Sequence, residues 1–214
     1  MRLDHISYAA SHDQISDVVN RIGSQIGTAF IDGGIHPKFG TRNFTAPLLN
    51  SQYLEVVCPL DHPATDATSF GQAVKKKAEA GGGWLTWVFS SNELFKVEEK
   101  FGRKAADGYR TRPDGSELKW KQIGVNEIIG SGELPFFIQW LTDNHPSRDG
   151  NSVAKITKIV IADDEKLADS WFQDEIQSGL KDIEIDWVKP EANHGDKGIL
   201  AVWLSSPSGQ ILID

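Results

Sequence analysis

The 214-residue sequence has only one cysteine, Cys58, and it has no apolar run long enough to cross a membrane. A single cysteine excludes an internal disulfide and a multi-cysteine metal cluster. The net charge of -8 argues against nucleic acid or an anionic membrane as the main partner. The opening residues, MRLDHISYAA, lack the charged start and apolar core of a secretory signal. We therefore expect a cytoplasmic protein whose partner is a small molecule.

What the sequence does contain is a unit that occurs three times. Each copy opens with about six strand-forming residues, passes a polar cap and continues as an amphipathic helix. In the first copy, Ser11 and Gln14 form a capping pair, and Gly23 is the expected end of the helix. In the third, the expected buried face of the helix comprises Ala168, Phe172 and Ile176. The copies begin LDHISYAASHDQISDVVNRIG, WLTWVFSSNELFKVEEKFG and ITKIVIADDEKLADSWFQDEI.

Three short strand-like runs follow each helix, so each copy reads β-α-β-β-β. This pattern predicts an α+β protein built from tandem βαβββ modules with mixed sheets. We place the first module at residues 1–62, a linking helix at 63–83, the second module at 84–146 and a third, βαβββ-like unit at 152–214.

Equivalent positions of the copies carry different polar groups. The third residue of each opening strand is His5, Thr86 or Lys158, and the last strands carry Glu55, Gln139 and Asp214. An imidazole and a carboxylate on neighbouring strands suit a divalent cation, to which Gln139 could add an amide oxygen. The alternative is that His5 and Glu55 only hydrogen-bond each other at the end of a sheet.

The stretch GGIHPKFGTRN, residues 33–43, is expected to be a long connection between two strands. His36 in this connection could hydrogen-bond the loop to itself together with Asn43. It could instead contact a substrate or act as a general acid or base. A third alternative makes His36 or His145 a second imidazole ligand of a metal.

Other polar and aromatic residues offer contacts to a ligand. Arg110 and Arg112 precede the turn RPDGSE and either lie on a solvated face or hold the carboxylate of a substrate. Trp87, with other aromatic residues of the second copy, supplies either core or pocket wall.

Several motifs together resemble the glyoxalase-like domain family of the vicinal oxygen chelate (glyoxalase/bleomycin resistance/dioxygenase) superfamily. The resemblance covers nearly the whole chain. It rests on LDHISYAA, GGIHPKFGTRNFTAPLLNSQYLEVVCP, RTRPDGSELKWK, and LPFFIQW with a later His145-Pro146.

The resemblance implies paired βαβββ modules whose curved mixed sheets surround a metal site, as in glyoxalase and dihydroxybiphenyl dioxygenase. The first-module ligands would be His5 and Glu55, and the second-module ligands would fall on Thr86 and Gln139. The implied cofactor is a divalent ion such as Zn, Mn, Fe or Ni. Relatives often dimerise, whereas two complete modules in one chain could surround the site without a partner, so both a homodimer and a monomer are open.

Two functions follow from the sequence. The first is a metal-dependent lyase, isomerase or dioxygenase for a small oxygenated organic molecule, with His36 and Glu55 as catalytic groups. Asn43, Arg112, Trp87 and Gln139 would contact its substrate. The second is a metal-free binding protein, of the drug-sequestering kind. Thr86 and Gln139 favour the second function, because both are neutral hydrogen-bonding groups.

Overall fold

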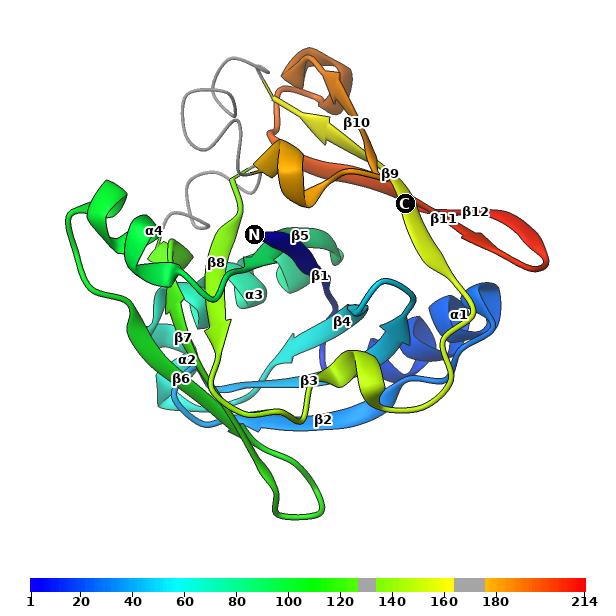
Figure 1. Cartoon of the computed structure of the whole chain (residues 1–214). Coiled ribbons are helices and arrows are strands. Elements are labelled where there is room, and N and C mark those ends of the chain that lie inside the picture. The colour runs from blue at the N-terminus through cyan, green and yellow to red at the C-terminus, as the bar shows by residue number, and fades with distance from the viewer. Residues whose placement is uncertain (127–133, 164–175) are drawn as a thin grey trace.

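The computed structural model describes residues 1–126, 134–163 and 176–214. Eight strands form a closed barrel in the order β1-β4-β3-β2-β6-β7-β8-β5, and four further strands form a separate sheet (Figure 1). Among the described helices, none is long and apolar enough to span a bilayer.

The barrel consists of two halves with the same topology, which confirms the predicted tandem βαβββ modules. In each half the first strand pairs in parallel with the fourth, and the other neighbours are antiparallel. The halves meet where β1 pairs with β5 and where Ile35 of β2 pairs with Thr111 of β6. The first half comprises β1 Arg2–Ala9, α1 Ile15–Ile26, β2 Ile31–His36, β3 Thr41–Leu48 and β4 Gln52–Pro59. The second comprises β5 Gly83–Ser90, α4 Leu94–Phe101, β6 Ala106–Thr111, β7 Glu117–Ile123 and β8 Phe136–Trp140.

Alternation along the strands separates two apolar clusters. Leu54 and Val56 of β4 point outward and pack in the cluster that α1 and the C-terminal sheet share with the barrel. Val57 points inward, to a cluster that also contains Val74 of α3. α3 therefore covers one end of the barrel interior. The link between the halves is formed by α2 Pro63–Ala67 and α3 Ser69–Glu79.

The C-terminal unit has the predicted order of strands but a different pairing. Its strands are β9 Lys155–Ala162, β10 Glu184–Val188, β11 Gly198–Ser206 and β12 Gly209–Ile213, in the sheet order β10-β9-β11-β12. The first strand of this unit, β9, is therefore an inner strand of its sheet, whereas β1 and β5 are the outermost strands of their halves. The sheet packs on the outside of the barrel, where the Trp84 indole donates to the Ile213 carbonyl at 2.9 Å. The predicted helix residues Ala168 and Phe172 lie outside the described residues.

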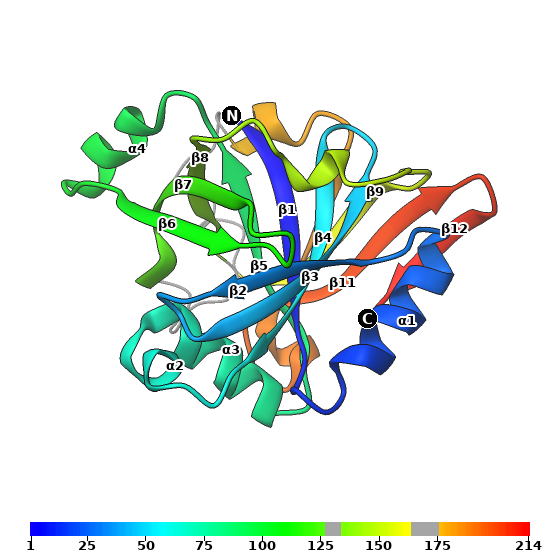
Figure 2. The ribbon, with the colours of Figure 1, turned by 90° about the horizontal axis from the view of Figure 1, so that it is seen from below.

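α1 lies on the outside of the barrel beside β12 (Figure 2). It extends beyond the expected end at Gly23 and ends at Gly27, which has the left-handed φ of 69° that a helix end favours. Gly23 is inside the helix, where a side chain would press against the Thr28 carbonyl. α4 ends before Gly102, which has the left-handed φ of 62°.

The glycine-rich stretch is largely strand, which corrects the expected long connection. β2 continues through His36, and only residues 37–40 form the turn to β3. His36 is buried inside the barrel as a consequence. Gly34 permits this arrangement: it has φ 93°, and a side chain there would overlap with the Thr111 carbonyl on β6.

Candidate functional site

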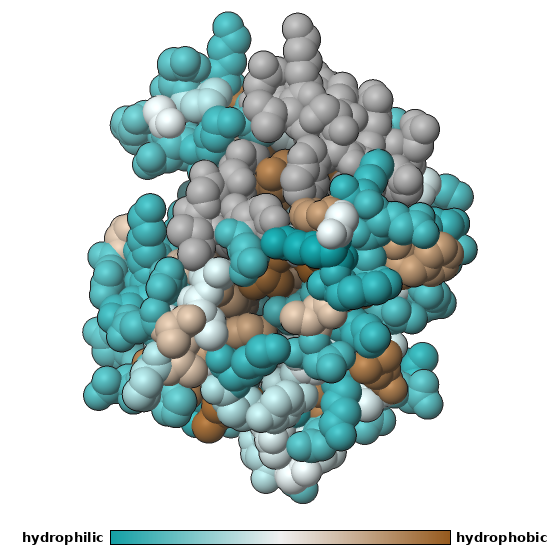
Figure 3. Space-filling view, turned by 90° about the vertical axis from the view of Figure 1, so that its left-hand side faces the viewer, coloured by the Kyte–Doolittle hydropathy of each residue, from teal (hydrophilic) through white to brown (hydrophobic). Residues whose placement is uncertain are grey.

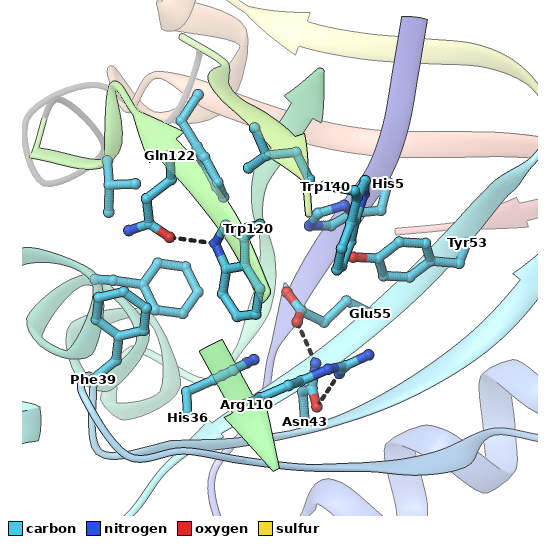
Figure 4. A pocket seen from close by; sticks show the side chains of 14 residues that line it. His5, His36, Phe39, Asn43, Tyr53, Glu55, Arg110, Trp120, Gln122 and Trp140 are labelled. Carbon is cyan, nitrogen blue, oxygen red and sulfur yellow. Dashed lines mark hydrogen bonds between the residues drawn. The ribbon is translucent and has the colours of Figure 1, made fainter. Parts of the chain in front are cut away.

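A cavity inside the barrel brings together polar groups from both halves. Its empty space is about 460 Å³, including the open mouth. The face of the molecule in Figure 3 is largely hydrophilic around small apolar hollows. The polar lining comprises His5, His36, Asn43, Glu55, Arg110 and Gln122. The aromatic lining comprises Phe39, Tyr53, Phe70, Trp120, Phe136 and Trp140 (Figure 4).

Glu55 projects from the middle of β4 and is 5% exposed. One carboxylate oxygen accepts a hydrogen bond from the Ser7 hydroxyl, and the other accepts one from the Asn43 amide at 2.6 Å. Burial opposes ionisation, but His5, His36 and these hydrogen bonds outweigh it, so the pKa of Glu55 lies below its usual value. Glu55 is therefore a buried anion at neutral pH.

Arg110 crosses the floor of the cavity beneath Glu55 (Figure 4). Its Nη1 donates to the Asn43 side-chain oxygen at 2.6 Å, so Asn43 connects the guanidinium to Glu55. Nε and Nη2 are buried and have no hydrogen-bond partner among the described residues. Burial lowers the pKa of Arg110, yet a guanidinium is so weak an acid that it stays charged at neutral pH. The cavity thus contains a buried cation with two unused donors.

His5 is held from behind by a carboxylate. Its Nδ1 lies 3.1 Å from Asp4, whose other oxygen lies 3.1 Å from Nε2 of His145. The His5 ring stacks on Tyr53, with centroids 4.3 Å apart. Burial would raise the pKa of Asp4, but the hydrogen bonds from His145 and His5 lower it far below the usual range. Asp4 is therefore an ionised acceptor, and the side chain is fully buried.

His36 lies in an apolar part of the cavity. The rings of Phe39, Phe70 and Trp120 surround it with centroids about 6 Å away, and Nδ1 lies 3.0 Å from the Thr41 hydroxyl. Burial lowers the pKa of His36 to about 4, because few polar groups replace the lost water. The imidazole is neutral at pH 7.

The structure brings together four of the predicted site residues: His5, His36, Asn43 and Glu55. It places the other three elsewhere. Arg112 forms a two-pronged ion pair with Asp149 outside the cavity. Trp87 packs in the outer apolar cluster, and Gln139 donates to the Asn92 carbonyl.

The position of Gln139 has a simple cause. The sequence repeat makes Gln139 the equivalent of Glu55 in the last strand of the second half. In the structure, its neighbours Ile138 and Trp140 are the residues of β8 that face the cavity. A slip of one residue reverses the face of every side chain in a strand. On β5, Val88 is directly opposite His5 and so shares its face.

Sequence reasoning missed one site residue, Asp4, and did not single out another, Arg110. Asp4 precedes an inward-facing residue and alternation would place it outside, but a register shift between Leu3 and His5 lets both Asp4 and His5 be buried on the inner side. The sequence signal that could have identified Asp4 was a carboxylate at the start of an apolar strand. Arg110 was noted only with Arg112, and nothing in the sequence distinguished which arginine would be inside.

The donor set does not fit a divalent metal. Within the described ranges, no three histidine, cysteine, aspartate or glutamate side chains are placed to hold an ion. In the second half, the expected ligand position Thr86 lies opposite Ser7, but its hydroxyl donates to the Trp87 carbonyl. The residues of β8 that line the cavity are Phe136, Ile138 and Trp140, which offer no metal ligand. The cation of Arg110 lies beneath Glu55, and its positive charge would oppose a second cation there. We therefore derive no chemistry from a bound metal.

A closed barrel of paired βαβββ halves around a polar cavity is the architecture of the vicinal oxygen chelate superfamily. Residues 3–174 match the sequence profile of the glyoxalase-like domain. The chain belongs to this glyoxalase-like domain family.

The fold also resembles that of one solved structure. A hypothetical protein from Staphylococcus aureus superposes with a TM-score of 0.59 at 16% identity, over 88% of this chain and 86% of that chain. A methylmalonyl-CoA epimerase from Mycobacterium tuberculosis gives a TM-score of 0.43 at 13% identity, over 64% of this chain and 87% of that one. The Streptomyces coelicolor epimerase in complex with 2-nitronate-propionyl-CoA gives 0.45 at 16% identity, over 66% and 99%. No curated protein matches the sequence.

Proposed function

We propose that the barrel binds a small oxygenated organic molecule without a divalent metal, and that Arg110 recognises an acidic group of this ligand. The observation that supports this proposal is the guanidinium on the cavity floor, which is buried and has two unused donors. Buried donors without acceptors are costly, so a ligand that supplies oxygen atoms gains binding energy there.

The charge and shape of the lining favour a compact acid. A carboxylate accepts two parallel hydrogen bonds from the edge of a guanidinium that carries Nε and one terminal nitrogen. This edge of Arg110 is the unpartnered one. Trp120, Phe136 and Trp140 offer apolar walls for the carbon skeleton of the ligand.

A metal-dependent lyase, isomerase or dioxygenase is the competing function. It requires an ion held by His5, Glu55 and further donors, and Gln139 points away from this group. The competing function predicts stoichiometric metal in the purified protein and loss of ligand binding in a chelator. The two functions therefore differ in a measurable way.

The test is a thermal-shift titration with pyruvate and with pyruvamide, its neutral analogue, each with and without EDTA. A ligand that binds only the native state raises the melting temperature. We expect pyruvate to stabilise the protein more than pyruvamide does, with no effect of EDTA, and we expect Arg110→Met to remove the difference. Arg148→Met, at an exposed arginine, is the matched control. Stabilisation that disappears in EDTA, together with one metal ion per chain by elemental analysis, would refute the proposal.

A further inference from the structure

Asp4 lies between two spaces in the protein. On one side His5 lines the barrel cavity, and on the other side His145 and Arg2 line an open polar hollow at the surface. Trp140 borders both spaces. A carboxylate that is fully buried between two imidazoles requires an explanation, because burying an unpaired charge is costly.

The contacts of Asp4 fix the direction of each hydrogen bond. One oxygen lies 2.8 Å from Nη2 of Arg2 and 3.1 Å from Nε2 of His145. The other accepts from the Trp140 indole at 3.2 Å and lies 3.1 Å from Nδ1 of His5. An ionised carboxylate only accepts hydrogen bonds, so His5 must donate its Nδ1 proton. Nε2 of a neutral His5 then carries a lone pair.

The surroundings hold the ring in this orientation. Tyr53 stacks on one face with an interplanar angle of 19°, and Phe136 contacts the ring with an interplanar angle of 81°. His5 lines the cavity, and its Nε2 has no hydrogen-bond partner among the described side chains. His36, the other imidazole of the cavity, lies against a threonine hydroxyl instead of a carboxylate. The two histidines are therefore not equivalent.

We propose that His5 is a general base for a molecule bound in the barrel cavity, and that Asp4 is the positioning residue that fixes its Nδ1–H tautomer. The inference rests on the proposed function only in that the molecule occupies the same cavity. A carboxylate behind an imidazole stabilises the imidazolium that forms when the opposite nitrogen takes up a proton.

The step is a reversible proton transfer. Nε2 of His5 takes a proton from a carbon next to a carbonyl group, the C–H electron pair moves into the new C=C bond, and the carbonyl oxygen becomes an enolate oxygen. The positive charge of Arg110 in the same cavity offsets the charge of the enolate. Return of a proton from Nε2 to the same carbon regenerates the molecule, and no oxidant or metal is consumed.

Two measurements test the proposal. The first is the tautomer of His5 in ¹⁵N-labelled protein, read from long-range ¹H–¹⁵N correlations and assigned with His5→Gln. We expect a protonated Nδ1 and a bare Nε2, and a changed pattern in Asp4→Asn. The second is deuterium uptake by the methyl or methylene groups of pyruvate, 2-oxobutyrate and acetoacetate in D₂O, followed by ¹H NMR.

We expect wild-type protein to accelerate exchange of at least one probe above buffer. His5→Gln should slow this exchange by about 100-fold or more, as is typical for loss of a general base. His12→Gln, at an exposed histidine, is the control that should change neither measurement. Asp4→Asn should lower the exchange rate even where its melting temperature matches that of wild type.

Each contrary result has a distinct meaning. A proton on Nε2 of His5 in the wild type would overturn the proposal, and binding of pyruvate would stand. If pyruvate stabilises the protein but exchange is no faster than in buffer, His5 is not a general base for these probes, and the proposed binding function stands. Exchange at the buffer rate without any stabilisation would overturn both.

Discussion

Gly33 of β2 and Arg110 of the neighbouring strand β6 lie against each other inside the barrel, and the absence of a side chain on Gly33 leaves room for the guanidinium. A Cβ atom on Gly33 would overlap with Nη1 of Arg110 and with the side-chain oxygen of Asn43. These are the two atoms that form the hydrogen bond connecting Arg110 to the Glu55 network. The glycine-rich stretch thus shapes the cavity in two ways: Gly33 leaves room for Arg110 and Asn43, and His36 lines the cavity.

Gly33→Ala should therefore displace Arg110. We expect a loss of about 1–3 kcal/mol in the free energy of unfolding, which is typical of overpacking, and loss of the preference for pyruvate over pyruvamide. Denaturant unfolding and thermal shift measure the two effects. Gly115→Ala is the control, because a side chain there meets open space and costs only the strain of φ 82°. The explanation is wrong if Gly33→Ala keeps the ligand preference and is no less stable than the control.

The Asn43 side chain hydrogen-bonds both Arg110 and Glu55, so we expect the contributions of these two residues to stability to be coupled. Arg110→Met leaves the buried carboxylate without its cationic partner and should cost about 3–5 kcal/mol of stability. Glu55→Gln alone should also destabilise, because it exchanges an acceptor for a donor toward Ser7 or Asn43. In the double variant the losses should be less than additive by about 0.5–3 kcal/mol. Additive losses in a double-mutant cycle would show that Asn43 does not couple the two charges.

The sequence predicted the tandem βαβββ halves because its strongest signal was a repeated local pattern. Strand runs, caps and amphipathic stripes depend on near neighbours, and β1, α1, β5 and α4 lie close to their expected positions. The inward direction of His5 and Glu55 also followed, since both interrupt apolar strands. These features required no knowledge of distant contacts.

The parts that could not be predicted depend on such contacts. The end of β2 at His36 requires the close approach of Gly34 to Thr111 in the other half. The burial of Asp4 requires a register shift against β5. The choice of Arg110 over Arg112 depends on Asn43 and Asp149, which lie far from both in sequence.

The register of β8 is tested by a pair of neighbouring substitutions. Gln139→Ala should change stability by no more than about 0.5 kcal/mol and leave ligand stabilisation intact, because its side chain lies outside the cavity. Ile138→Ala should cost about 2–5 kcal/mol, because this side chain is 2% exposed in the inner cluster. Denaturant midpoints with unchanged slopes would measure both. The reverse order of the two effects would mean that the strand is shifted by one residue.

Protonation of His36 should determine how stability changes in mild acid. In the unfolded chain this imidazole has its ordinary pKa of 6.5, whereas burial lowers the pKa to about 4 in the native state. Between these values the unfolded chain binds a proton that the native protein does not, so stability falls as the pH is lowered from 6.5 to 4. The shift corresponds to about 3 kcal/mol. The depressed pKa values of Asp4 and Glu55 act in the same sense, because the unfolded chain again binds protons that the native protein does not, but their stabilisation is lost only as the pH falls below the ordinary carboxyl range.

The measurement is the free energy of unfolding at a series of pH values for wild type and for His36→Gln. We expect the variant to be less stable at pH 7, where it loses the packing against Phe39, Phe70 and Trp120, but to lose less stability on acidification. His12→Gln, which removes an exposed histidine, should retain the wild-type slope. A His36→Gln slope equal to that of wild type between pH 6.5 and 4 would mean that the imidazole is protonated inside the barrel, and that an acidic neighbour compensates for its burial.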